Sequence, residues 1–68
     1  MEMIEVKSSN VKKIGFDNNN LYVEYSGGIY VYKQVPKVLY EELVNSESKG
    51  KYMNTYIKGH YDFDRVKE

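Results

Sequence analysis

The chain has 68 residues, a length that leaves room for one core only, so we expect a single domain over residues 1–68. Its residues are 41% hydrophobic and 29% charged, a composition that excludes an intrinsically disordered chain. Ten basic residues balance ten acidic ones, so net charge does not favour nucleic acid or anionic lipid as a partner. The lack of cysteine excludes disulfides and thiolate metal sites, and without a long apolar run or a basic-then-apolar start we expect a cytoplasmic, non-membrane protein.

The first half of the chain predicts an antiparallel β-meander of three to four short strands. Segments rich in Val, Ile, Tyr and Phe surround two turn signals. Asn18 and Asn19 tolerate a positive φ in the first turn, and Gly27 and Gly28 permit a tight second turn. The stretch at residues 4–7 predicts an additional strand at the edge of the sheet.

The two turns also predict which residues pair across the strands. If the two glycines form the second turn, Tyr25 faces Tyr30 and Val23 faces Tyr32. The asparagine turn pairs Ile14 with Val23, which agrees with this alternation. One sheet face then carries an apolar set: Ile14, Phe16, Leu21, Val23, Tyr25, Tyr30 and Tyr32. A slip by one residue would bury charged side chains at a cost of several kcal/mol, so this face is expected to be the core face.

Two helices are expected to follow and to pack on this face. Pro36 suits the first position of a helix over residues 36–45. Ser48 can cap a second helix, which Gly59 ends. The second helix has an apolar stripe at helical spacing: Tyr52, Met53, Tyr56 and Ile57. The predicted fold class is therefore α+β, a small antiparallel meander followed by two helices, with Phe63 or its neighbours packing a last aromatic ring on the body.

Landmarks along nearly the whole chain occur together, in the same order, in one known family. They are Val6–Asn10, Ile14–Asp17, Tyr30–Tyr32, Val35–Pro36, Ser48–Tyr52 and Tyr61. With this tyrosine-x-tyrosine centre the chain resembles the KTSC domain, a short domain of some lysyl-tRNA synthetase C-termini and of small bacterial and phage proteins. The resemblance implies no catalytic residues and an unknown activity, with RNA binding suggested by the synthetase association. Phe16 stands where the family often has tyrosine, and Met53 stands where an aromatic residue is common. Both replacements are apolar, so the predicted core is unchanged.

Catalytic and cofactor chemistry is not expected from the residues present. Nucleophilic catalysis needs a base within reach of a nucleophile, and the one histidine, His60, follows a helix-ending glycine where it suits a surface or capping role. Glu41 and Glu42 are neighbours that point apart on a helix, and Asp62 and Asp64 lie near the end of the chain. We therefore expect no enzyme activity, no metal site and no cofactor.

The leading interpretation is a non-catalytic binding module that contacts RNA or another nucleic acid. Residues 49–61 carry three lysines and no acid, so Lys49, Lys51 and Lys58 predict a basic patch on the second helix. Tyr22, on the outer sheet face, or Tyr56 could stack on a base beside this patch. Tyr30 and Tyr32 have the spacing of a base-stacking sheet, but the register assigns both to the core face.

The alternative is a protein-interaction module that binds a partner chain or a second copy. Its contact surface would be the outer sheet face, with Tyr22, Ile29 and Val31, or an edge strand. Salt distinguishes the two classes, because binding to phosphates weakens steeply as salt is added whereas an apolar contact barely changes or strengthens.

Overall fold

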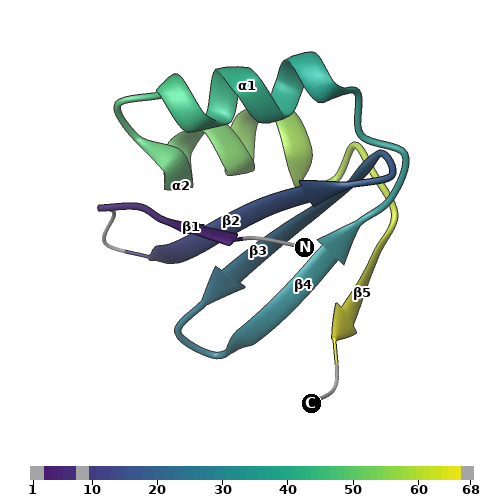
Figure 1. Cartoon of the computed structure of the whole chain (residues 1–68), viewed down its shortest axis with the longest axis horizontal. Helices are drawn as coiled ribbons and strands as arrows, with labels where there is room; N and C mark the ends of the chain where they lie inside the picture. The colour runs from purple at the N-terminus through teal and green to yellow at the C-terminus, as the bar shows by residue number, and fades with distance from the viewer. Residues whose placement is uncertain (1–2, 8–9, 67–68) are drawn as a thin grey trace.

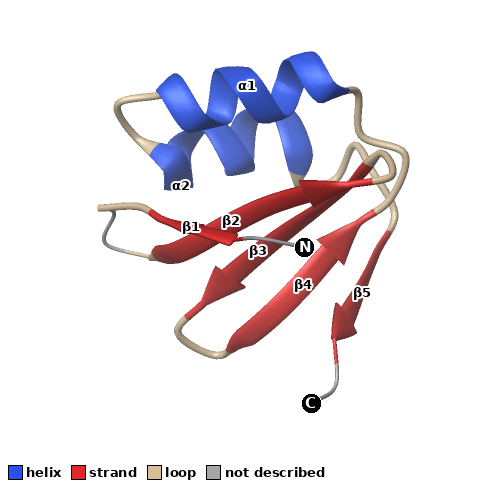
Figure 2. Ribbon diagram, viewed as in Figure 1, coloured by secondary structure: helices blue, strands red, loops and turns tan. Residues whose placement is uncertain are grey.

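The computed structural model describes residues 3–7 and 10–66, so Ser8 and Ser9 of the family landmarks lie outside this part. Its elements are β1 (Met3–Glu5), β2 (Val11–Asp17), β3 (Asn20–Tyr25), β4 (Gly28–Tyr32), α1 (Lys37–Asn45), α2 (Lys49–Tyr52), η1 (Met53–Ile57) and β5 (Phe63–Val66). The strands form one antiparallel sheet in the order β1-β2-β3-β4-β5. The helices cover one face of this sheet (Figures 1 and 2). Within the described residues, no helix is long and apolar enough to cross a membrane.

The α+β fold class is confirmed, with one strand more than predicted. The expected edge strand at residues 4–7 exists as β1, and the unexpected strand is β5, which pairs with β4 through Tyr32↔Phe63 and Ile29↔Val66. An exposed ion pair between Lys33 Nζ and Asp64 Oδ2, 2.6 Å apart, joins the ends of these two strands. The hydrogen bond to Asp64 raises the pKa of Lys33.

The first hairpin has the predicted register. Ile14 pairs with Val23, as expected, and Asn18 and Asn19 adopt φ values of 54° and 65° in the turn. Asparagine tolerates this left-handed region better than other residues with a side chain. A bulge between Val11 and Lys13 then shifts the pairing by one residue, which lets Val11 point into the core with 0% exposure.

The predicted pairing of the second hairpin is wrong by two residues. Tyr25 pairs with Gly28 rather than with Tyr30, and Val23 pairs with Tyr30, so Ser26 and Gly27 form the turn. Gly28 is the first residue of β4 and has a φ of 142°. A Cβ at this position would lie 3.0 Å from Nε of Arg65, so both the backbone and the neighbouring strand favour glycine. Because side chains alternate with a period of two, the predicted core face is still correct.

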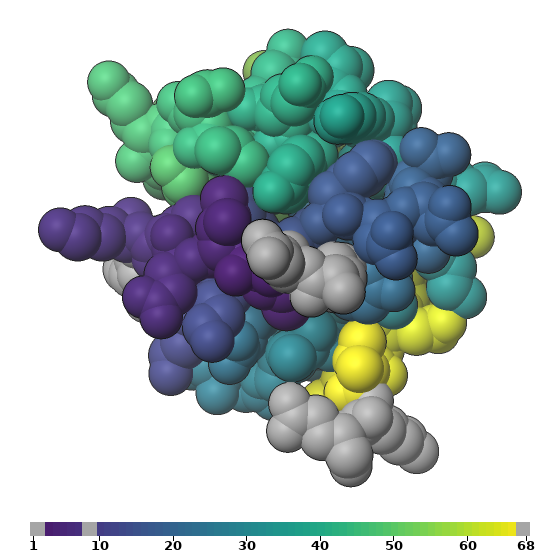
Figure 3. Space-filling model, viewed as in Figure 1, coloured from purple at the N-terminus to yellow at the C-terminus, as the bar shows by residue number. Residues whose placement is uncertain are grey.

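The core lies between the helices and the central strands. It consists of nine buried residues: Val11, Ile14, Leu21, Val23, Tyr32, Val35, Leu43, Met53 and Ile57. Of the predicted core tyrosines, Tyr32 is 3% exposed, whereas Tyr25 and Tyr30 are only half-buried. In the space-filling view, β5 lies on the opposite side of the molecule from α1 (Figure 3), so the helical layer does not extend over the whole sheet.

Both helix starts are close to their predicted positions. Pro36 is the N-cap of α1 rather than its first residue, and the Oγ of Ser48 accepts a hydrogen bond from the backbone N–H of Lys51. The second helix changes from α to π geometry, because the N–H of Lys58 donates to the carbonyl of Met53, five residues back, at 2.7 Å. Gly59, with a φ of 82°, ends the helix as predicted.

The π turn corrects two expectations for the second helix. Met53 and Ile57 are buried as predicted, but Tyr56 is 52% exposed and does not belong to the buried stripe. Lys58 is predicted to belong to a basic patch on the second helix, whereas its ammonium lies over the ring of Tyr25 on the sheet. A five-residue turn rotates the residues after it relative to a regular 3.6-residue helix, which accounts for the altered direction.

Replacing Tyr32 by alanine should reduce the free energy of unfolding by about 3 to 5 kcal/mol, since its buried ring leaves a cavity. Tyr30→Ala should cost clearly less, because the ring of Tyr30 is half-buried and opens onto solvent. Urea denaturation followed by circular dichroism measures both. Equal losses in the two variants would show that the helices cover Tyr30 as completely as Tyr32.

Candidate functional site: an aromatic cleft beside Lys58

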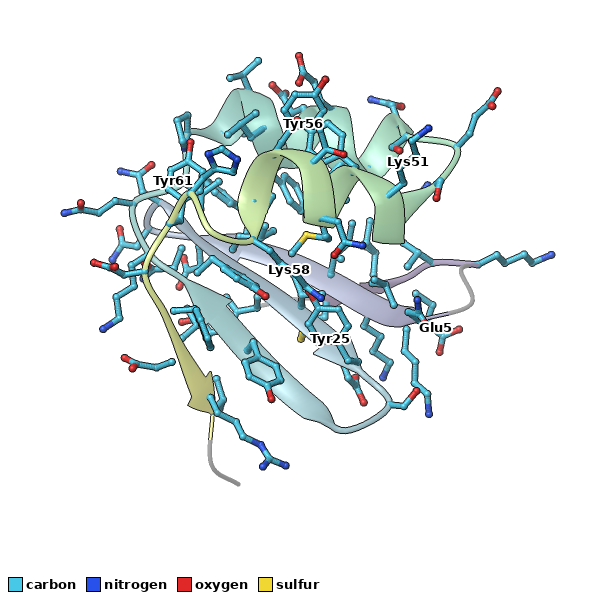
Figure 4. The ribbon with its side chains drawn as sticks, turned by 180° about the vertical axis from the view of Figure 1, so that it is seen from behind. Glu5, Tyr25, Lys51, Tyr56, Lys58 and Tyr61 are labelled. Carbon is cyan, nitrogen blue, oxygen red and sulfur yellow. The ribbon has the colours of Figure 1, made fainter. Side chains whose placement is uncertain are left out.

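The three lysines of the predicted basic patch do not form one surface. The Nζ of Lys49 is half-buried and donates a hydrogen bond to the carbonyl of Ser46 at 2.5 Å, so this lysine ties the start of α2 to the preceding loop. Lys51 is exposed in the first turn of α2, and Lys58 follows the end of η1. Figure 4 shows Lys51 and Lys58 at different ends of the helix, with Lys58 directed toward the sheet.

The two tyrosines expected to stack beside this patch also lie apart. Tyr22 pairs with Gly15 and Val31 and lies on the sheet face that the helices leave open, opposite the face that Lys58 contacts. Tyr56 is exposed on η1 and packs on Tyr52, with ring centroids 4.7 Å apart. Burial, followed by a 2.7 Å hydrogen bond to Glu42, raises the pKa of Tyr52. Of the five predicted site residues, Lys58 adjoins a cleft lined by four aromatic rings, whereas Tyr22 lines a separate and more polar hollow.

This aromatic cleft is a hollow of about 430 Å³ between the end of η1 and strands β3, β4 and β5. Its lining residues are Tyr25, Gly27, Tyr30, Tyr32, Lys58, Gly59 and Phe63. The volume lies within the range of small-molecule sites, roughly 300 to 1,000 Å³. The lining contains one cation and no acidic side chain, so the cleft favours a ligand that combines a planar apolar group with negative charge.

The rings of the cleft pack against each other at angles that leave ring surface open. Tyr25 and Tyr30 meet edge to face, with centroids 5.7 Å apart and planes at 71°. Phe63 packs on Tyr30 at 5.8 Å and on Tyr32 at 5.6 Å, yet it stays 55% exposed. Phe63 is therefore held in position by its neighbours while its outer surface is available to a ligand.

The hydroxyl group of Tyr25, in the lining of the cleft, holds its proton more strongly than a free tyrosine does. The oxygens of Tyr25 and Tyr32 are 3.2 Å apart and share a hydrogen bond. Burial, and secondarily this hydrogen bond, raises the pKa of Tyr25 well above its usual range. The ammonium of Lys58 lies 4.9 Å from the centroid of this neutral ring, so it makes a cation–π contact and no ion pair with Tyr25.

Sequence reasoning missed Tyr25, Tyr30 and Phe63 as site residues. The tyrosines belong to the core face by register, and Phe63 lies in a strand that the sequence does not predict. The available signal is the surplus of large side chains on one face, since two short helices cannot cover all seven residues predicted for the core face.

Other predicted features have structural roles. The Nε2 of His60 lies 3.1 Å from the carbonyl of Thr55, and the backbone N–H of His60 donates to the carbonyl of Ile57 at 3.0 Å. Both contacts reach carbonyls of the last helical turn, which agrees with the surface or capping role predicted for His60. Among the described residues, no three His, Cys, Asp or Glu side chains gather where they could hold a metal ion.

Comparison with known proteins identifies the same family over most of the chain. The model of the KTSC domain matches residues 7–61. A KTSC domain protein from Yersinia pestis has a crystal structure that superposes with a TM-score of 0.94 at 28% identity, covering 97% of each chain.

Curated relatives fall into two kinds. A protein named lysine–tRNA ligase from Nostoc punctiforme is 31% identical over 67 residues, which are 94% of this chain and 12% of that protein. The chain thus spans about an eighth of the length of the ligases it matches. An uncharacterized protein from Stutzerimonas stutzeri is 31% identical over 97% of this chain and 99% of its own length.

The raised pKa of Tyr25 predicts a loss of stability in alkaline solution. A tyrosine in the unfolded chain ionises near pH 10, whereas Tyr25 in the folded chain holds its proton to higher pH. Its contribution is therefore fully present below about pH 10 and falls as the pH rises further. Thermal melts between pH 8 and 11.5 should show a smaller alkaline decline in Tyr25→Phe than in the unsubstituted protein. Identical declines would contradict the assignment.

Proposed function

The chain belongs to the KTSC domain family, and we propose that it is a non-catalytic module that binds single-stranded RNA in the aromatic cleft. The observation that carries this proposal is the contact between Lys58 and the ring of Tyr25, at the edge of a cleft walled by further aromatic rings. A nucleotide offers the matching pair of features, a flat base that stacks on a ring and a phosphate that pairs with a cation.

Single-stranded nucleic acid suits this cleft better than a duplex. Stacking on Phe63 or Tyr30 requires a base with a free face, and only unpaired bases can present one to a side chain. The cleft, at about 430 Å³, also has the size of a small-molecule site, which is far smaller than the surface of a duplex groove. An RNA loop or an unpaired end fits these limits.

The relatives provide a second line of support. Several are named as ligases of lysine and tRNA, and this chain corresponds to about an eighth of their length. A segment of that size could add contacts to an RNA without taking part in the chemistry. The residues of the cleft agree with a binding role, since they are rings and one lysine rather than a nucleophile with an adjacent base.

Replacing Phe63 by alanine should weaken RNA binding by roughly five- to 150-fold, because one stacked base contributes about 1 to 3 kcal/mol. Tyr56→Ala is the matched control, since Tyr56 is 52% exposed against 55% for Phe63 but lies outside the cleft. Fluorescence anisotropy with a labelled single-stranded RNA measures both variants. A loss in Tyr56→Ala alone would instead assign binding to the outer side of η1.

Replacing Lys58 by glutamine should weaken binding at low salt and reduce the slope of log affinity against log salt by about 0.7, the effect of one phosphate contact on a single strand. Lys49→Gln is the control, because its ammonium is already engaged by the carbonyl of Ser46. The same titrations at 50 and 200 mM salt give both slopes.

Two outcomes would reject the RNA proposal. One is the absence of binding at millimolar protein. The other is association that strengthens with salt and is lost when Val31 or Tyr22 of the open sheet face is changed, which would favour the protein-interaction module. The half-buried apolar residues of that face, among them Ile29 and Val66, are the observation behind this second candidate.

A further inference from the structure

A second, more polar cavity of about 270 Å³ adjoins the aromatic cleft. Its lining residues are Asn10, Tyr25, Ser26, Gly27, Gly50, Met53, Asn54 and Lys58. This polar cavity lies between the second helix and the β3–β4 turn, so it extends the same hollow toward the start of α2. Like the aromatic cleft, it has no acidic side chain in its lining.

The two cavities share Tyr25, Gly27 and Lys58. The Lys58–Tyr25 contact therefore stands at the boundary between them, between the helix and the hairpin (Figure 4). A cation at this point faces both cavities. In a polynucleotide, the group that lies between two successive bases is a phosphate, which is the group that a lysine at this boundary would bind.

The side chains of the polar cavity differ in kind from those of the aromatic cleft. Asn10 and Asn54 are exposed at its rim, and each amide offers donors and an acceptor to the edge of a base. Gly50 adds no side chain to the lining beside Asn10, where a Cβ would be in ordinary contact, 3.7 Å from the amide nitrogen. The buried side chain of Met53 forms an apolar wall. Rings accept any base, whereas amides distinguish one base edge from another.

Resting on the proposed function, we infer that the site takes two consecutive nucleotides and selects the second by its base. The first base stacks in the aromatic cleft without discrimination, and the linking phosphate lies at Lys58. The second base enters the polar cavity, where the amide of Asn54, assisted by Asn10, reads its edge. Adenine is the expected base, because an asparagine amide can donate to its N7 and accept from its N6 amino group together.

Titration of labelled oligoadenylate, oligocytidylate and oligouridylate hexamers tests this selection. The unsubstituted protein should bind oligoadenylate at least about fivefold more tightly than the other two, as expected for one paired amide contact. Asn54→Ala should remove most of this preference. Thr55→Ala, an exposed polar neighbour outside the cavity lining, should keep it.

Phe63→Ala separates this inference from the proposed function. It should weaken all three hexamers by a similar factor and leave the ratio between them unchanged. Equal binding of the three hexamers by the unsubstituted protein, or an adenine preference that persists in Asn54→Ala, would overturn the selection while leaving RNA binding in place. If no hexamer binds, the proposed function and the inference both fail.

The two-nucleotide footprint has its own readout in nuclear magnetic resonance spectra of the labelled protein. The dinucleotide ApA should shift the signals of Phe63 and the side-chain amide of Asn54 together. Adenosine monophosphate at the same occupancy should shift one of these sets much less. Equal shifts at both positions with the mononucleotide would show that the two cavities do not bind successive nucleotides.

Discussion

Two short helical segments pack on one face of a five-stranded sheet, and they are too small to cover all of it. The rest of the structure follows from this difference in size. α1 has nine residues, and α2 and η1 have four and five. They bury the inward-facing Val11, Ile14, Leu21 and Val23 of β2 and β3 completely, but they leave the rings of Tyr25 and Tyr30 only half-buried. Tyrosine suits this boundary because its ring packs while its hydroxyl tolerates water. The aromatic cleft is the part of the core face that the helices do not reach.

The π turn gives that uncovered face its charge. A regular helix end would have continued the spacing of Met53 and Ile57, whereas the five-residue step directs Lys58 toward Tyr25. Lys58 is thereby both the residue that caps the end of the helix and a lining residue of the aromatic cleft and of the polar cavity. π turns occur frequently at functional sites, where the altered direction of a side chain outweighs the poorer helix geometry.

The sequence contains most of the fold but little of the site. Alternation of apolar and charged residues determines the core face, and it survives even the two-residue error at Gly28, because alternate residues share a face. β5 could not be predicted, since Asp64 and Arg65 interrupt its apolar character and its partner strand precedes both helices. The cleft depends on this long-range pairing and on the π turn. Lys58 could therefore be identified as basic and accessible, but its aromatic neighbours could not.

β5 has a further consequence for how the cleft behaves. It is an edge strand of four residues, three of them exposed, and β4 is the one strand with which it pairs. Its detachment would remove Phe63 from the cleft while leaving the nine buried residues packed, so local opening requires much less free energy than global unfolding. Amide hydrogens of β5 should therefore exchange with solvent sooner than those of β2 and β3. A ligand that contacts Phe63 would slow this exchange. Binding in the cleft would then be detected as slower amide hydrogen exchange in β5, without a change in the overall structure.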